Sequence, residues 1–233
     1  MMSIRAHSKS RCPQCFMSGA LCLCAELISI DTQTSVTVVM HYGEARTSSN
    51  TGRLAHHLLS RSQIVIRGEA GNPISRADLS QPDTDAYVLF PSAEAIEITP
   101  EWAASLKRPA HLIVPDGNWN QAKKVLKREP ALAGAIPVKL PPGPPSRYRL
   151  REAPRAEAVC TLEAIARALA LLEGPERGPL VESHLMAAFD KMVERVLWSR
   201  GHLKTHEAKT GIPPEAVEAR QKSGFPSKKL ETT

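Results

Sequence analysis

The stretch with the clearest capacity for chemistry is Asp116-Gly117-Asn118-Trp119, which directly follows an apolar run at 112–115. The apolar run predicts a buried strand, and the residues that follow to position 128 predict an amphipathic helix. The carboxylate of Asp116 then lies at the carboxyl end of a strand, where open α/β sheets bind their ligands. Asn118 can cap the helix, and Gly117 allows a tight turn or a close approach to a ligand.

The predicted helix has two distinct faces. Trp119, Ala122 and Leu126 share an apolar face. A second face is polar and basic, at helical spacing, and carries Asn120, Lys123, Lys124 and Lys127. Such a basic ridge suits phosphate contacts, although a capped surface helix with solvated lysines is the plainer interpretation.

Four of the five cysteines lie within thirteen residues, in a C-x2-C-x6-C-x-C pattern made of Cys12, Cys15, Cys22 and Cys24. Clustered thiols in a chain without a visible secretion signal favour a metal over disulfides. Four thiolates suit tetrahedral zinc, and the site is structural because it leaves no open position for a substrate. The alternative is a set of redox-active or coincidental cysteines.

Two further segments carry groups that could bind anions. Residues 47–54 are rich in hydroxyls, with Asn50, Thr51 and Arg53, and lead into a helix whose start they could cap or use to bind phosphate. A second segment, 146–155, places four arginines around Tyr148. Arginine offers a planar donor fork to phosphate or carboxylate, and a solvated charge run is the alternative.

Strands alternate with helical stretches along the chain, which predicts an α/β fold with a mainly parallel sheet flanked by helices. The expected strands are 36–40, 63–67, 86–90, a central strand from His111, and 136–140. The expected helices run to about Ser60, then over 100–107, 118–128, 157–173 with its start near Cys160, and 181–200. The residues after 202 are polar and basic, and we expect them to be mobile.

Length, composition and net charge limit the possible classes of protein. The 233 residues are 42% hydrophobic, enough for one large domain with or without a small appendage. No apolar stretch approaches the roughly 20 residues of a membrane span, and no secretion signal is visible, so cytoplasmic location is the default expectation. A formal charge of +6 favours an anionic partner, nucleic acid first. Aromatic residues make up only 4%, which argues against extensive base stacking.

Taken together, six blocks resemble the DTW-domain family, the tRNA-uridine aminocarboxypropyltransferases, which are related to the SPOUT-type RNA-modifying enzymes. The resemblance extends from the cysteine cluster to about residue 200. Its blocks are the cysteines at 12–24, Ser49 to Leu54, Phe90-Pro91, Asp116 to Trp119 with Ala122-Lys123, Ser146 to Ala153, and Cys160-Thr-x-Glu163. Asn118 stands where the family motif usually has threonine, and asparagine keeps the capping ability.

The resemblance implies a SPOUT-like sheet with a C-terminal knot and a small N-terminal zinc module. It divides the chain into a four-cysteine zinc module at 1–30, a catalytic domain at 31–202 and a tail at 203–233. The implied donor is S-adenosylmethionine, although no Gly-x-Gly-x-x-Gly fingerprint is present. The implied reaction transfers the 3-amino-3-carboxypropyl group to N3 of a uridine in tRNA and releases methylthioadenosine. We expect a monomer without a membrane or an obligate protein partner.

The resemblance also assigns roles to residues of this chain. S-adenosylmethionine is expected to contact Phe90, Pro91, Ser92, Asp116, Gly117, Trp119, Leu140, Tyr148, Leu150, Arg151 and Thr161. The tRNA is expected to contact Arg46, Asn50, Thr51, Arg53, Lys123, Lys124, Lys127, Arg147 and Arg149. Asp116 is the candidate for the base that takes the N3 proton; it could instead bind the donor's amino group or hold the loop. The rival functions are an RNA methyltransferase on the same scaffold and a non-catalytic zinc-containing RNA-binding protein.

Overall fold

The computed structural model describes residues 11–69, 71, 73–151 and 157–222 of the chain. Its centre is a six-stranded sheet in which every neighbouring pair of strands is parallel, in the order β2-β1-β5-β3-β6-β4. The strands are β1 (Ser35–His41), β2 (Ser62–Arg67), β3 (Asp85–Leu89), β4 (Ile96–Glu97), β5 (Ala110–Asp116) and β6 (Ile136–Lys139). The predicted fold class, a mainly parallel sheet flanked by helices, is confirmed.

The strand that ends in Asp116 lies inside the sheet. β5 pairs with β1 on one side and β3 on the other, and all seven of its residues are buried. Helices cover both faces of a parallel sheet, so its inner strands are apolar throughout instead of alternating with polar residues. Leu112 and Val114 face one apolar cluster, whereas Ile113 belongs to a second cluster on the opposite face.

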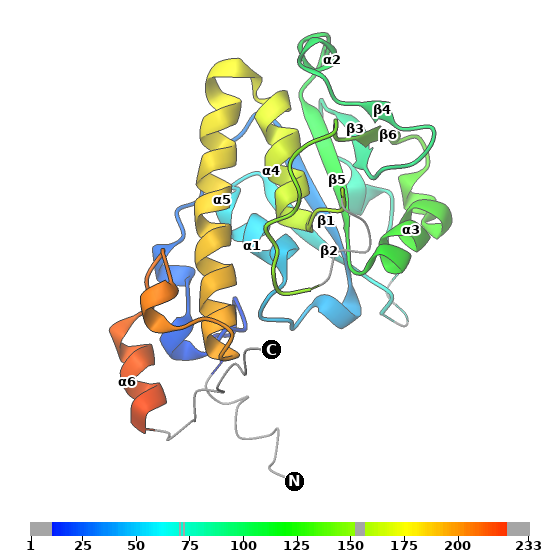
Figure 1. Cartoon of the computed structure of the whole chain (residues 1–233). Helices are drawn as coiled ribbons and strands as arrows, with labels where there is room; N and C mark the ends of the chain where they lie inside the picture. Colours follow the sequence, from blue (N-terminus) through cyan, green and yellow to red (C-terminus); the bar gives the residue numbers. More distant parts are fainter. Residues whose placement is uncertain (1–10, 70, 72, 152–156, 223–233) are drawn as a thin grey trace.

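The described part of the chain has six α-helices. They are α1 (Thr51–Leu58), α2 (Pro100–Ala104), α3 (Trp119–Arg128), α4 (Thr161–Leu172), α5 (Gly174–Ser199) and α6 (Pro214–Lys222). Figure 1 shows α6 beside the end of α5, away from the sheet. The face covered by α1, α4 and α5 holds the larger apolar cluster, and α3 packs on the other face. Each predicted helix and strand is present within a few residues of its expected bounds, except at the start of α5.

The largest difference from the predicted elements is this helix start. The second C-terminal helix was expected from Val181, but α5 begins at Gly174, directly after α4, and continues past Pro179. Gly178 lies where the two helices meet, and a Cβ there would be 1.9 Å from the carbonyl oxygen of Ala170. The glycine therefore permits close helix packing. The two-residue strand β4 was not predicted, since it is too short to show a pattern.

The expected mobile tail is wrong for its described part. Residues Pro214–Lys222 form α6, Ala216 is buried, and the guanidinium of Arg220 lies over the Trp198 ring of α5 at 4.7 Å. Residues 223–233 of the predicted tail, and Arg155 of the arginine-rich segment, lie outside the described residues.

Among the described helices, none combines the length and the apolar character needed to cross a membrane. The C-terminal knot and the division at residues 30 and 202 stay predictions.

Candidate active site and metal centre

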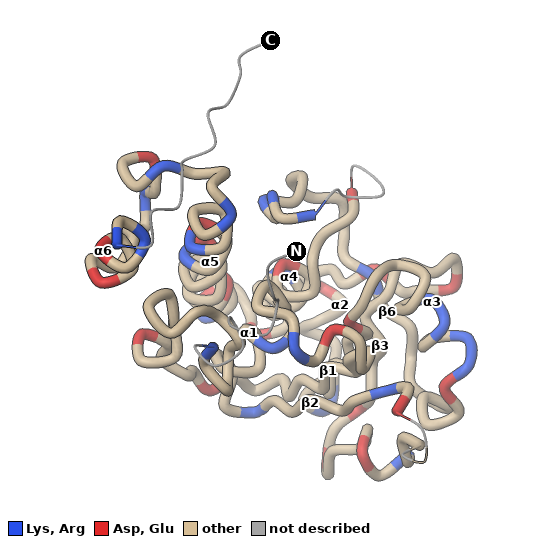
Figure 2. The backbone as a smooth tube through the Cα atoms, turned by 90° about the horizontal axis from the view of Figure 1, so that it is seen from below, with Lys and Arg blue, Asp and Glu red and all other residues tan. Residues whose placement is uncertain are grey.

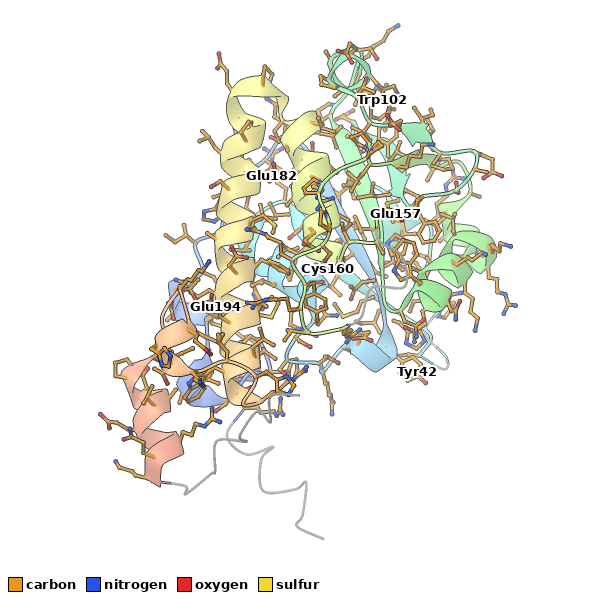
Figure 3. The ribbon with its side chains drawn as sticks, in the orientation of Figure 1. Tyr42, Trp102, Glu157, Cys160, Glu182 and Glu194 are labelled. Carbon is orange, nitrogen blue, oxygen red and sulfur yellow. The ribbon has the colours of Figure 1, made fainter. Side chains whose placement is uncertain are left out.

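A cavity of about 710 Å3 opens at the carboxyl edge of the sheet, between α3 and α4. Figure 3 labels Cys160 and Glu157, which lie on one of its walls. The lining combines apolar side chains such as Leu89, Val114 and Leu140 with acidic and basic groups. A concave, largely apolar site with a few polar groups is typical of small-molecule binding.

The carboxylate of Asp116 lies at the inner wall of this cavity and is only 4% exposed. Its Oδ2 accepts a hydrogen bond from Asn50 Nδ2 at 2.7 Å, and its Oδ1 accepts one from Thr161 Oγ1 at 2.5 Å. Burial raises the pKa of Asp116, while these two hydrogen bonds favour the charged form and oppose the rise. Each carboxylate oxygen keeps acceptor capacity for a further donor.

Helix α1 begins so close to Asp116 because of two residues. Asn50 is the N-cap of α1, and its Oδ1 accepts from the Arg53 amide at 2.6 Å, which directs its Nδ2 toward Asp116. Gly52 follows two residues later, and a Cβ at this position would lie 3.0 Å from Asp116 Cγ and 2.9 Å from Val38. A larger residue would push the helix and its cap away from the carboxylate.

The turn after Asp116 has the predicted caps. Asn118 Oδ1 accepts from the Gln121 amide at 2.9 Å, and Gln121 Oε1 accepts from the Asn118 amide at 2.7 Å, a complete capping box. Gly117 has a φ of 155°, and a Cβ there would be 2.8 Å from Gln121 Oε1. The turn exposes Trp119 to the cavity, where its ring lies 5.8 Å from that of Phe90.

The segment 146–151 forms another wall and is held from both ends. Buried Glu163 of α4 accepts from Ser146 Oγ at 2.5 Å, the Arg147 amide at 2.7 Å and the Cys160 amide at 3.0 Å. Tyr148 donates its hydroxyl to the Ser49 carbonyl at 2.7 Å, and burial raises the pKa of Tyr148. The segment is therefore held against α1 and α4.

An ion pair fixes the end of this segment at the cavity. Arg151 donates two hydrogen bonds to Glu44, at 2.7 and 3.2 Å, and both side chains line the cavity. The charge of Glu44 raises the pKa of Asp116, whereas the charge of Arg151 lowers it. The cavity therefore presents a cation and an anion next to each other.

Most residues predicted to contact the donor lie together in this cavity. They are Phe90, Pro91, Asp116, Gly117, Trp119, Leu140, Tyr148, Arg151 and Thr161. Ser92 and Leu150 do not line it: the Ser92 hydroxyl is buried without a hydrogen-bond partner among the described residues, and Leu150 packs against the larger apolar cluster. Asn50 and Thr51, predicted as RNA contacts, are buried and line the cavity.

The predicted basic contacts fall into two groups. Arg46, Lys123, Lys124, Lys127, Arg147 and Arg149 are exposed. Figure 2 shows the basic positions of α3 along the edge of the molecule. Arg147 also pairs with Asp190 of α5 at 3.3 Å. Arg53 differs, because its guanidinium donates to the Ala45 carbonyl and lies over the ring of Phe16.

Two carboxylates that line the cavity or organise one of its walls were not predicted as site residues. Glu163 organises the segment 146–151, and its place three residues after Cys160 gives a capping-box spacing that could have identified it. Glu44 follows β1 by three residues, and only the tertiary structure shows that it meets Arg151. Lys139 and Arg167 line the far part of the cavity, with no sequence signal beyond their charge.

The four clustered cysteines form a centre that fits one metal ion. Their sulfur atoms lie within 4.8 Å of one another, and the Cys12–Cys24 and Cys15–Cys22 pairs are 3.7 Å apart. A tetrahedron of sulfurs with Zn–S bonds of about 2.3 Å has edges of about 3.8 Å. The arrangement matches tetrathiolate zinc, and four protein ligands make the site structural.

The parallel sheet has a cavity at its carboxyl edge, and this cavity contains a buried carboxylate. The N-terminal part adds a four-cysteine centre. These features are typical of an α/β protein that binds a small molecule and carries a structural metal module. Residues 9–197 match the family model described as "DTW domain", and the chain belongs to that family.

The chain is also similar to several named proteins. The chain is 29% identical over 215 residues to tRNA-uridine aminocarboxypropyltransferase A of Arabidopsis thaliana, covering 80% of this chain and 81% of that protein. It is 28% identical over 173 residues to tRNA-uridine aminocarboxypropyltransferase 2 of Drosophila melanogaster, covering 72% and 68%. Among solved structures, the SAM-dependent rRNA:acp-transferase Tsr3 from Vulcanisaeta distributa aligns with a TM-score of 0.44 and 16% identity, over 79% of this chain and 88% of that one.

Proposed function

We propose that this protein transfers the 3-amino-3-carboxypropyl group of S-adenosylmethionine to N3 of a uridine in tRNA. The observation that carries the proposal is the placement of the family motif: Asp116 and Trp119 line one cavity together with Tyr148 and Thr161. The relatives in Arabidopsis and Drosophila are named tRNA-uridine aminocarboxypropyltransferases, which supports transfer of this group to a uridine in tRNA. An RNA methyltransferase on the same scaffold is the alternative.

The cavity has the chemistry that such a donor requires. Its volume of about 710 Å3 lies within the roughly 300–1,000 Å3 of small-molecule sites. Apolar walls from Leu89, Pro91 and Leu140 suit a nucleoside. The neighbouring charges of Glu44 and Arg151 suit an amino-acid zwitterion, whose ammonium and carboxylate need partners of opposite sign.

When bound, S-adenosylmethionine supplies a carbon next to a sulfonium. As N3 of uridine forms a bond to this carbon, the carbon–sulfur bond breaks, its electron pair stays on sulfur, and neutral methylthioadenosine leaves. The protein must remove the N3 proton and hold the reacting atoms in line. Asp116 is the proposed base: its carboxylate is fixed by Asn50 and Thr161 and keeps lone pairs for a further donor. Burial raises its pKa, which makes it a stronger base than an exposed aspartate.

A second role for Asp116 is the alternative within this proposal. Its carboxylate could bind the ammonium group of the donor, because it is buried and already accepts two hydrogen bonds. The two roles differ in what the variant Asp116→Asn changes. A lost base lowers the rate of transfer at saturating donor, whereas a lost ammonium contact raises the dissociation constant of the donor.

The proposed tRNA contacts lie beside the cavity. Exposed lysines of α3 are on one side, and Arg147 and Arg149 are on the segment that forms another wall. Contacts of this kind release counterions, so tRNA binding should weaken steeply as salt increases. A reacting uridine must also leave its stack to enter the cavity. We place the reaction in the cytoplasm and expect the protein to act as a monomer.

The experiment that tests the function incubates the purified protein with unmodified tRNA and S-adenosylmethionine and weighs both products. The proposal requires a uridine heavier by the aminocarboxypropyl group, together with methylthioadenosine. A methylated nucleoside with adenosylhomocysteine would identify the methyltransferase alternative. Binding of tRNA without any change of either substrate, across a complete tRNA pool, would identify a non-catalytic RNA-binding protein.

A further inference from the structure

The cysteine module packs directly against α1, the helix whose N-cap residue Asn50 donates a hydrogen bond to Asp116. In the cysteine module, by which we mean residues 11–26 of the predicted zinc module at 1–30, the ring of Phe16 lies under the guanidinium of Arg53, with 4.8 Å between Cζ and the ring centroid. A small space between the two parts is lined by Cys15 and Met17 on the module side and by Arg53 and His57 on α1. The contact therefore lies on one face of α1, near its N-terminus.

Arg53 connects this contact to the cavity. Its guanidinium donates to the Ala45 carbonyl in the loop before α1, and its backbone amide donates to Asn50 Oδ1 at 2.6 Å. The other end of the Asn50 side chain donates to Asp116 Oδ2. A continuous set of contacts thus runs from the Phe16 ring through Arg53 and Asn50 to the buried carboxylate.

The backbone at Phe16 is unusual. Its φ is +57°, in the left-handed region that non-glycine residues rarely adopt. The Phe16 amide donates to the Cys12 carbonyl at 2.9 Å, and Arg11 donates to the Phe16 carbonyl at 2.8 Å. The module therefore holds its backbone in a strained conformation that directs the aromatic ring toward α1.

The module is also anchored to α5 on its other side, so it can restrict the movement of α1. Buried Arg195 of α5 donates to the Cys22 carbonyl at 3.0 Å and to Glu26 at 2.5 Å. Lys191, one turn earlier, pairs with Glu26 at 3.0 Å. These contacts fix the module against a 26-residue helix, and α1 then lies between two rigid parts.

Residues 11–26, the described cysteine-bearing part of the predicted zinc module, offer few groups for a direct contact with RNA. The basic side chain among these described residues is Arg11, and its Nη1 donates to the Phe16 carbonyl. Phosphate contacts require several available cations. The contact between the Phe16 ring and Arg53 of α1 accounts for the position of this part of the module.

We infer that the cysteine module is a brace for the reaction cavity, and that Phe16 is a positioning residue which, through Arg53 and Asn50, fixes the carboxylate of Asp116. The inference rests on the proposed function for its consequence on catalysis, whereas its structural part is independent of that function. Zinc bound by the four cysteines would hold Phe16 in place, and the ring would hold the first turn of α1.

The test compares Phe16→Leu, which removes the ring but keeps an apolar side chain, with Phe16→Tyr, which keeps the ring. Hydrogen exchange is measured at the amides of Arg53 and Leu54, which bond to Asn50. Zinc content, tRNA affinity and the kcat and KM of transfer are measured on the same samples. Arg220→Leu, which removes the contact with Trp198 on α5, is the matched control.

In Phe16→Leu we expect exchange at both amides to rise about tenfold and kcat to fall about tenfold, as for a cation–π contact of intermediate strength. Zinc content and tRNA affinity should not change, and Phe16→Tyr and Arg220→Leu should keep wild-type values of exchange at α1 and of kcat. Unchanged exchange in Phe16→Leu would overturn the brace, and so would weakened tRNA binding with kcat intact.

Two further outcomes, loss of zinc in Phe16→Leu and absence of transfer by the wild type, can be distinguished from failure of the brace. If Phe16→Leu loses zinc, the variant Arg53→Lys is used in its place, because it weakens the same contact and leaves the module intact. Raised hydrogen exchange in Arg53→Lys supports the brace, and wild-type exchange overturns it. If the wild-type protein transfers no aminocarboxypropyl group, the proposed function fails, and the exchange measurement still decides the brace.

Discussion

Thr161, the first residue of α4, donates its hydroxyl to Asp116 Oδ1 at 2.5 Å, although 45 residues separate the two in the chain. Together with Asn50, Thr161 fixes both oxygens of a carboxylate that is buried at the end of β5. Three separate motifs of the family therefore meet at one side chain. The arrangement explains why a buried aspartate can keep a single orientation toward the cavity.

Replacing Thr161 should change the pH dependence of transfer. The hydroxyl stabilises the charged form of Asp116, so Thr161→Val should raise the pKa of this carboxyl further. If the ionised form is the base, activity is lost as the pH falls through that pKa, and the acidic limb should move to higher pH by about one unit. Rate–pH profiles of kcat measure the shift.

The control for this prediction is Thr161→Ser, which keeps the hydroxyl. It should retain the wild-type profile, whereas a serine variant that shifts like valine would point to packing and not to the hydrogen bond.

Glu163 should be essential to the stability of the segment 146–151. It is 1% exposed and accepts three hydrogen bonds. In Glu163→Gln, one acceptor oxygen becomes an amide that faces donors, and we expect a loss of about 2–3 kcal/mol in the free energy of unfolding. Urea unfolding measures it. The exposed Glu218 offers the matched change Glu218→Gln, which should cost about 0.5 kcal/mol or less.

Gly178 should tolerate no side chain. An added Cβ would lie 1.9 Å from the Ala170 carbonyl oxygen, so Gly178→Ala must push α4 and α5 apart, at an expected cost of about 3 kcal/mol or more. Gly174→Ala is the comparison, because a Cβ there meets nothing within 4 Å and only the φ of +79° opposes it, at about 1–2 kcal/mol. Equal melting temperatures for the two variants would show that the helices can separate easily.

His111 should make the fold sensitive to acid. It is buried in β5, with Nδ1 2.7 Å from Ser35 Oγ and Nε2 3.1 Å from Thr37 Oγ1. Burial lowers the pKa of His111 from 6.5 to about 4. The unfolded chain binds this proton more readily, so stability is complete above about pH 6.5 and falls by up to about 3 kcal/mol as the pH decreases to about 4.

Acid also protonates the zinc thiolates, so the measurement needs a reference variant. His111→Gln keeps the zinc site and removes the titrating ring. Unfolding free energies at several pH values should fall less steeply in this variant than in the wild type, and parallel curves would contradict the assignment.

The sequence predicted the elements of this fold where local patterns are strong. The apolar run at 112–115 and the Asn118 cap place Asp116 correctly at the carboxyl end of a strand, and the spacing of the four cysteines predicts the metal centre. The same reasoning failed at Gly178-Pro179, where close packing against α4 outweighs the weak helix propensity of both residues.

The contacts between side chains around the cavity could not be predicted from the sequence as well as the helices and strands could. Asn50 and Arg53 appeared as RNA contacts because amides, hydroxyls and arginines at a helix start suit phosphate. Their actual partners, Asp116 and Phe16, are 66 and 37 residues away in the chain. Such pairings depend on which helix crosses which strand, and no local pattern encodes this.

The most direct test of the account follows methylthioadenosine release with tRNA by the wild type and by Asp116→Asn. The amide keeps the shape of the side chain, and the Thr161 hydroxyl can turn to accept from it, so the melting temperature should not change. We predict one methylthioadenosine for each modified uridine in the wild type, and a rate at least about a hundredfold lower in the variant. A folded Asp116→Asn with wild-type release would contradict the proposed role of Asp116. Adenosylhomocysteine in place of methylthioadenosine would contradict the reaction itself.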